Sequence, residues 1–148
     1  MREYTAATVA IPSVDSPPPA RPLRILLVED SASLAERLAE AIGQMHDVAE
    51  LAGIADTEAD ALAAVERAAV DVVLMDLHLK QGTGFGLMRA LAARAVPPCI
   101  VVLTNYDLPE YKSAAIELGA AYFLDKIRDY DRLPEVLRDL ACGAPAAH

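Results

Sequence analysis

The sequence predicts an α/β domain in which five parallel strands are covered on both faces by helices. From Leu23 onward, short apolar runs alternate with segments of helical period, and polar side chains follow the runs directly. The 148 residues suit one domain with a single good-sized core. We therefore expect a doubly wound domain over residues 23–142, with an N-terminal tail over residues 1–22 and a short C-terminal tail over residues 143–148.

The N-terminal tail differs in composition from the rest of the chain. Residues 1–22 contain five of the ten prolines and lack hydrophobic periodicity. This composition is typical of a disordered or partly extended leader, and a contact between the tail and a partner is the alternative.

Five apolar runs are the expected strands. Each is short, and most are rich in Val, Ile and Leu, as strands buried on both faces are. The second run differs from the others because it is rich in alanine. The runs are LRILLV (23–28), VAELAGIA (48–55), VDVVLM (70–75), CIVVL (99–103) and AAYFL (120–124).

Five helices are expected between and after these runs, because apolar side chains recur there at helical spacing. Ser31 or Ser33 is the expected cap of the first helix, Gly119 ends the fourth, and Pro134 is tolerated in the first turn of the fifth. The apolar faces comprise Leu34, Leu38, Ala41, Ile42 and Met45; Leu62, Val65 and Ala69; Phe85, Met88 and Ala92; Tyr111, Ala114, Ala115 and Leu118; and Leu133, Val136, Leu137 and Leu140.

Charge, cysteine content and hydropathy exclude several classes of function. The formal net charge of −9 and the lack of a basic cluster on any expected helix argue against a nucleic-acid partner. Two cysteines make no disulfide framework, and nothing resembles a secretory signal, which predicts a cytoplasmic protein. No apolar run approaches the roughly 20 residues that span a bilayer, so we expect no membrane partner either.

The polar side chains that directly follow the first, third, fourth and fifth runs are of particular interest. In an open α/β sheet the ligand site lies beyond the carboxyl ends of the strands, so these side chains should gather at one edge. They are Glu29 and Asp30 after the first run, Asp76 after the third, Thr104 after the fourth, and Asp125 and Lys126 after the fifth.

This combination of residue types suits phosphoryl transfer. Clustered carboxylates repel one another, and Mg²⁺ relieves the repulsion while leaving room for a phosphate. A carboxylate beside the cation can attack phosphorus to give an aspartyl-phosphate. The cation, a lysine and a hydroxyl would then surround the charged equatorial oxygens.

Four segments resemble the signature segments of bacterial response-regulator receiver domains. They are LRILLVEDS, VDVVLMDLHLKQGTG, IVVLTN and LGAAYFLDK, and the similarity covers residues 23–141. The resemblance implies a flavodoxin-like fold with strand order 2-1-3-4-5. It also implies phosphotransfer signalling, with a histidine kinase or a histidine phosphotransfer protein as the phosphoryl donor.

The resemblance assigns roles to the residues at the strand ends. Asp76 corresponds to the phosphoacceptor, Glu29 and Asp30 to the acidic pair that binds the metal, and Lys126 to the lysine that contacts phosphate. We favour the backbone carbonyl of His78 as a further metal ligand, with its imidazole lining the entrance.

A switch and an access path are also expected. Thr104 corresponds to the switch hydroxyl and Phe123 to the rotating aromatic, and their movement would change the face around Tyr111, Tyr122 and Lys126. His78 and Tyr106 lie two residues beyond Asp76 and Thr104, where bulky rings can overhang the site. We interpret them as a shield that slows loss of the phosphoryl group, and assistance by His78 is the alternative.

The sequence departs from the family pattern at three positions. Lys80 and Ile127 stand where prolines are usual, and Asn105 replaces a small residue. A cis peptide bond at Ile127 is not expected, because it costs about 2.5–4 kcal/mol without proline.

Other classes of function are weighed against this one. A receiver-like scaffold that has lost phosphorylation conflicts with the full acidic set. A phosphohydrolase with an aspartate nucleophile normally carries a second acid where His78 stands, and a flavin-binding protein needs a phosphate-cradling loop where EDSAS stands. We do not expect an enzyme acting on other substrates. Only CGAPAAH follows the fifth helix, which predicts a stand-alone receiver that acts by protein contact or onward phosphotransfer.

Overall fold

Five parallel strands form one sheet in a computed structural model that describes residues 21–105 and 108–143. Their order is β2-β1-β3-β4-β5, which confirms the expected flavodoxin-like topology. All five apolar runs form strands, although the third begins at Val72 rather than Val70. The strands are β1 (Leu23–Val28), β2 (Ala49–Ala55), β3 (Val72–Met75), β4 (Cys99–Thr104) and β5 (Ala120–Asp125).

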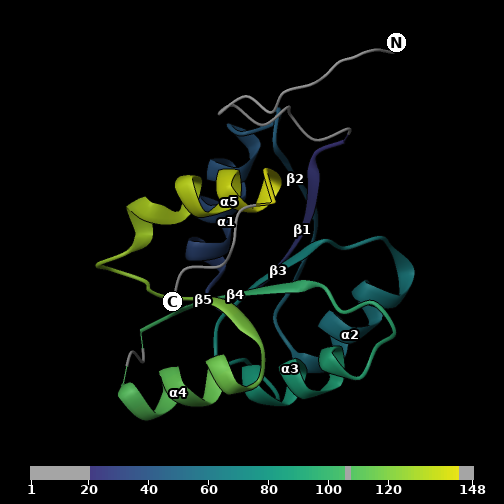
Figure 1. Cartoon of the computed structure of the whole chain (residues 1–148), viewed down its shortest axis with the longest axis vertical. Coiled ribbons are helices and arrows are strands. Elements are labelled where there is room, and N and C mark those ends of the chain that lie inside the picture. Colours follow the sequence, from purple (N-terminus) through teal and green to yellow (C-terminus); the bar gives the residue numbers. More distant parts are fainter. Residues whose placement is uncertain (1–20, 106–107, 144–148) are drawn as a thin grey trace, which may run out of the picture.

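Helices cover both faces of the sheet (Figure 1). Helices α1 and α5 lie on one face, and α2, α3 and α4 lie on the other. Their bounds are Ala32–Gly43 for α1, Glu58–Arg67 for α2, Gly84–Ala92 for α3, Pro109–Glu117 for α4 and Leu133–Ala141 for α5, with a short 3₁₀ helix at Tyr130–Arg132.

Local side-chain chemistry sets where the first three helices begin. The hydroxyl of Ser31, rather than that of Ser33, caps α1 by accepting a hydrogen bond from the backbone N–H of Leu34 at 3.4 Å. Thr57 caps α2 and Thr83 caps α3 in the same way. These caps place each helix immediately after the turn that leaves the carboxyl end of a strand.

The sheet divides the core into two layers. Alternate residues of β1 enter different layers: Ile25 and Leu27 pack with α1 and α5, and Leu26 and Val28 pack with α2, α3 and α4. The same alternation corrects one expectation. Tyr122 is 2% exposed and lies in the α1–α5 layer, so it is not part of an exposed switch face.

Arg21 lies at the boundary between the expected tail and the domain. Its guanidinium forms an ion pair with Asp71 at 2.7 Å, at the turn that precedes β3. The rest of the expected tails, residues 1–20 and 144–148, lies outside the described residues, and the domain boundaries stay predictions.

Leu38 tests the importance of the α1–α5 layer. The side chain is 1% exposed, so truncation in Leu38→Ala should leave a cavity and lower the free energy of unfolding by about 2–5 kcal/mol. Urea unfolding measures the loss. Leu51→Ala on the edge strand β2, where the side chain is 36% exposed, is the matched control and should cost less.

Candidate functional site

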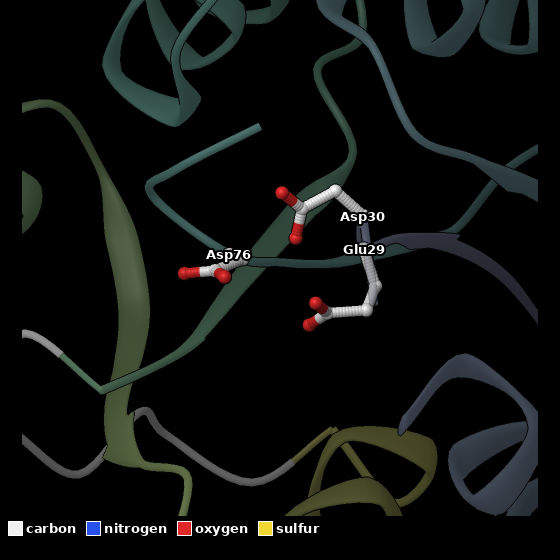
Figure 2. A group of neighbouring side chains, drawn as sticks. All are labelled: Glu29, Asp30 and Asp76. Carbon is white, nitrogen blue, oxygen red and sulfur yellow. The ribbon is translucent and has the colours of Figure 1, made fainter. Parts of the chain in front are cut away.

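Three carboxylates meet at the carboxyl edge of the sheet. Glu29 and Asp30 follow β1, Asp76 follows β3, and one oxygen of each lies within 4.8 Å of the others. Figure 2 shows that Glu29 and Asp30 extend to different sides of the end of β1. Glu29 and Asp76 are buried, at 4% and 5% exposed, whereas Asp30 is exposed. Asp30 is therefore the acid of this group that solvent reaches most easily.

Lys126 neutralises part of this negative charge. Its ammonium lies 2.8 Å from Oδ2 of Asp76 and 2.9 Å from Oε1 of Glu29, and its side chain is only 10% exposed. The backbone N–H of Lys126 donates to the carbonyl of Thr104 at 2.9 Å, which joins the ends of β5 and β4. One residue therefore links three strand ends through its side chain and its backbone.

Burial and hydrogen bonding act in opposite directions on the ionisation of this group. Burial raises the pKa of Glu29, and hydrogen bonds from Lys126 and from the backbone N–H of Ser31 only partly offset that rise. Burial lowers the pKa of Lys126, but its hydrogen bonds to Asp76 and Glu29 outweigh this effect and leave that pKa raised. Lys126 is thus held as an ammonium at neutral pH.

Thr104 and Phe123 lie near the same edge in different environments. Thr104 is fully buried at the end of β4 and pairs with Asp125 in the register with β5. Phe123 is partly buried, in the layer that contains α4, and the ring of Tyr111 belongs to the same layer. Phe123 therefore borders the α4 side of the sheet, and Thr104 ends the neighbouring strand β4.

The loop after Asp76 directs His78 toward α4. The backbone N–H of His78 donates to Oδ1 of Asp76 at 3.4 Å. Its imidazole is exposed and stands edge-on to Tyr111, with 6.4 Å between the ring centroids. Tyr106, the other residue expected to overhang the site, lies outside the described residues.

Asp125 has a structural role that the sequence analysis did not assign. Its Oδ1 accepts hydrogen bonds from the backbone N–H groups of Ile127 and Arg128, both at 2.8 Å, and its own N–H donates to Asp129 at 2.9 Å. The signal was present in the sequence, since an aspartate often accepts from the backbone two residues later. The Lys126–Ile127 peptide bond is trans.

An acidic depression of about 440 Å³ opens beside Asp30, between α1, β2 and α2. Small apolar side chains of α1 contribute to its lining. Its acidic lining residues are Glu29, Asp30, Glu36, Asp56 and Asp60. This distribution concentrates negative potential on the approach to the three carboxylates and favours the entry of cations.

The sheet order and the acidic edge with its lysine define the class of protein. Both are features of phosphotransfer receivers, and the chain matches the model of the response regulator receiver domain over residues 25–138. The chain therefore belongs to the receiver-domain family of two-component response regulators.

Similar proteins come from several bacteria. The chain is 33% identical over 106 residues to the protein-glutamate methylesterase/protein-glutamine glutaminase 5 of Myxococcus xanthus, covering 71% of this chain and 30% of that protein. It is 30% identical over 116 residues to the sensory transduction protein LytT of Bacillus cereus, covering 78% of this chain and 46% of LytT. The chain thus spans less than half the length of these two relatives.

Solved structures show the same fold. The signal receiver domain of the response regulator NarL from Mycobacterium tuberculosis superposes with a TM-score of 0.75 at 24% identity, covering 83% of this chain and 98% of that domain. The response regulatory domain of mrkE from Klebsiella pneumoniae gives a TM-score of 0.72 at 25% identity over 82% of this chain and 97% of that domain.

Among the described residues, no helix is long and apolar enough to cross a membrane.

The raised pKa of Glu29 predicts a pH-dependent contribution to stability. For an acid whose pKa is higher in the folded state, this contribution is present below the unfolded-state value of about 4.3 and is lost as pH rises through the folded-state pKa. The stability of the wild type relative to Glu29→Gln should therefore fall as pH rises above about 4. Urea unfolding over a pH series without divalent cations measures this difference, and a constant or rising difference would contradict the assignment.

Proposed function

We propose that Asp76 accepts a phosphoryl group from a histidine kinase or a histidine phosphotransfer protein. The observation that supports this proposal is the placement of the Asp76 carboxylate, 2.8 Å from the Lys126 ammonium and within 4.8 Å of carboxylate oxygens of Glu29 and Asp30. A nucleophilic carboxylate needs compensation of the phosphate charge, and both a cationic side chain and a cation-binding acidic pair adjoin this one.

The acidic group fits a magnesium ion. All of its donor atoms are carboxylate oxygens, which hard cations prefer, and the depression beside Asp30 leaves room for water ligands. Asp30, Asp76 and Glu29 would hold the ion, together with the backbone carbonyl of His78. When bound, Mg²⁺ compensates the charge that develops on the phosphoryl oxygens.

Asp76, Lys126 and Thr104 have separate roles in the transfer of the phosphoryl group. An oxygen of Asp76 forms the new bond to phosphorus, while the bond between phosphorus and the donor imidazole nitrogen breaks and that nitrogen keeps the electron pair. The Lys126 ammonium, which contacts the carboxylates before transfer, then donates hydrogen bonds to the phosphoryl oxygens. The Thr104 hydroxyl donates a further hydrogen bond to these oxygens.

Signalling would follow from a movement of Thr104 toward the phosphoryl group. Thr104 is completely buried, so its displacement has to be filled by a neighbour. Phe123 is the candidate, because its ring is partly buried and lies in the layer that contains α4. Inward rotation of Phe123 would change the surface of α4 and β5 that a partner contacts. A small change in packing would thereby alter the binding of that partner.

Phosphorylation of Asp76 is tested with acetyl phosphate and Mg²⁺ as the donor system. The wild type should gain the mass of one phosphoryl group, whereas Asp76→Asn should keep the fold and gain none, because an amide does not form an acyl phosphate. Intact mass spectrometry measures both. Asp139→Asn, on the exposed side of α5, is the matched control and should be modified like the wild type. A modified Asp76→Asn protein would end the assignment, and an unmodified wild type would leave a receiver-like scaffold as the function.

The lifetime of the aspartyl-phosphate tests the roles of His78 and Tyr106. Hydrolysis needs a water in line with phosphorus, so rings that cover this approach slow the reaction. We expect Tyr106→Ala to lose phosphate faster than the wild type, as measured by the decay of the phosphorylated mass after donor removal. A slower Tyr106→Ala protein would contradict shielding, and slower decay in His78→Ala alone would favour assistance by the imidazole.

A further inference from the structure

The loop that follows Asp76 is fastened to the turn between β2 and α2. The backbone N–H of Lys80 donates to the carbonyl of Asp56 at 3.1 Å, and the N–H of Glu58 donates to the carbonyl of Gln81 at 3.1 Å. The Lys80 ammonium also lies 3.5 Å from Oδ2 of Asp56. The segment that carries His78 is therefore attached to a part of the chain about twenty residues earlier in the sequence.

The Glu58 carboxylate extends this attachment to the start of α3. Its Oε1 accepts a hydrogen bond from the backbone N–H of Thr83, the residue that caps α3, at 3.3 Å. Two glycines make the space for it: a Cβ atom at Gly82 would lie 2.6 Å from Oε1 of Glu58, and one at Gly86 would lie 2.7 Å from it. A negative charge beside the N-terminus of α3 also complements the helix dipole.

The start of α3 in turn touches the backbone of Asp76. The N–H of Gly84 donates to the carbonyl of Leu77 at 2.8 Å. A Cβ atom at Gly84 would lie 2.6 Å from the carbonyl oxygen of Asp76 and 2.8 Å from Cα of Leu77. Thr83, whose N–H donates to Glu58, is the neighbour of Gly84 in the chain, so a shift of Thr83 would move Gly84 relative to the backbone of Asp76 and Leu77.

We infer that Glu58 is a positioning residue for the site at Asp76. By holding Thr83, the Glu58 carboxylate sets the position of the first turn of α3, and this turn sets the backbone of Asp76 and the loop that presents the His78 carbonyl. The inference rests on the proposed function, because it assigns Glu58 to the geometry of the same metal and phosphoryl site.

Four variants separate positioning from folding. Glu58→Ala removes the acceptor, whereas Glu58→Gln keeps an oxygen that can accept from Thr83. Gly86→Ala leaves Glu58 in the sequence but puts a methyl group where its carboxylate lies, and alanine is favoured over glycine inside a helix. Glu66→Ala, an exposed residue further along α2, is the matched control.

The primary measurement is the affinity for Mg²⁺ by calorimetric titration of each folded variant. Loss of a group that orients metal ligands costs about 10-fold or more in affinity, and we expect this loss for Glu58→Ala and Gly86→Ala. Glu58→Gln should stay near the wild type, and Glu66→Ala should not change. Gly86→Ala added to Glu58→Ala should cause no further loss, because the group it displaces is already absent.

A second measurement needs neither metal nor phosphoryl donor. Amide hydrogen exchange at Thr83 and Gly84 should be faster in Glu58→Ala and Gly86→Ala than in the wild type, while amides in the middle of α2 stay protected. This pattern distinguishes local release of the loop from general loss of stability.

Several results would overturn the inference. Wild-type Mg²⁺ affinity in Glu58→Ala or Gly86→Ala would show that the carboxylate does not position the site. An equal loss in Glu58→Gln would exclude the hydrogen bond to Thr83 as the cause, and a loss in Glu66→Ala would indicate a general effect of α2. If the wild type binds Mg²⁺ but takes no phosphoryl group, the proposed function fails while the affinity comparison still decides the role of Glu58.

Discussion

The contact of the Lys126 ammonium with Asp76 and Glu29 is the interaction on which the site depends. Two carboxylates are buried at the end of adjacent strands, and burial of like charges without compensation is unfavourable. Lys126 supplies the compensation from β5, which is not a neighbour of β1 in the sheet. The topology therefore holds together a charge arrangement that no local segment of the chain could hold.

The same arrangement places a cation beside a buried acid. A hydrophobic replacement for the ion pair would bury the strand ends with less desolvation, as happens in many protein cores. Here the lysine instead keeps a positive charge 2.8 Å from Oδ2 of Asp76. The site thus gives up some potential stability to keep a charged carboxylate at a defined place.

Much of the fold could be predicted from the sequence because strands buried on both faces need continuous apolar runs, and the caps Ser31, Thr57 and Thr83 follow simple rules. The grouping of Glu29, Asp30, Asp76 and Lys126 could be expected because parallel strands end at the same edge. The expectation that Tyr122 belongs to the same exposed face as Tyr111 is wrong, because consecutive residues of a strand face opposite ways and Tyr122 points to the layer opposite that of Phe123 and Tyr111. The contact of Glu58 with Thr83 could not be predicted from the sequence, because it depends on how the turn before α2 and the loop before α3 approach each other in space.

The backbone donors at Lys80 and Ile127 have a consequence for how this sequence can change. At both positions the N–H group is engaged, with the carbonyl of Asp56 and with the side chain of Asp125. A proline at either position would remove the donor and with it the hydrogen bond that holds the loop. At Ile127 the acceptor is the carboxylate of Asp125. Loss of the Ile127 N–H would therefore also remove one of the hydrogen bonds that Asp125 accepts. A single substitution to proline at either place would therefore leave an acceptor, the Asp56 carbonyl or the Asp125 carboxylate, without one of its donors.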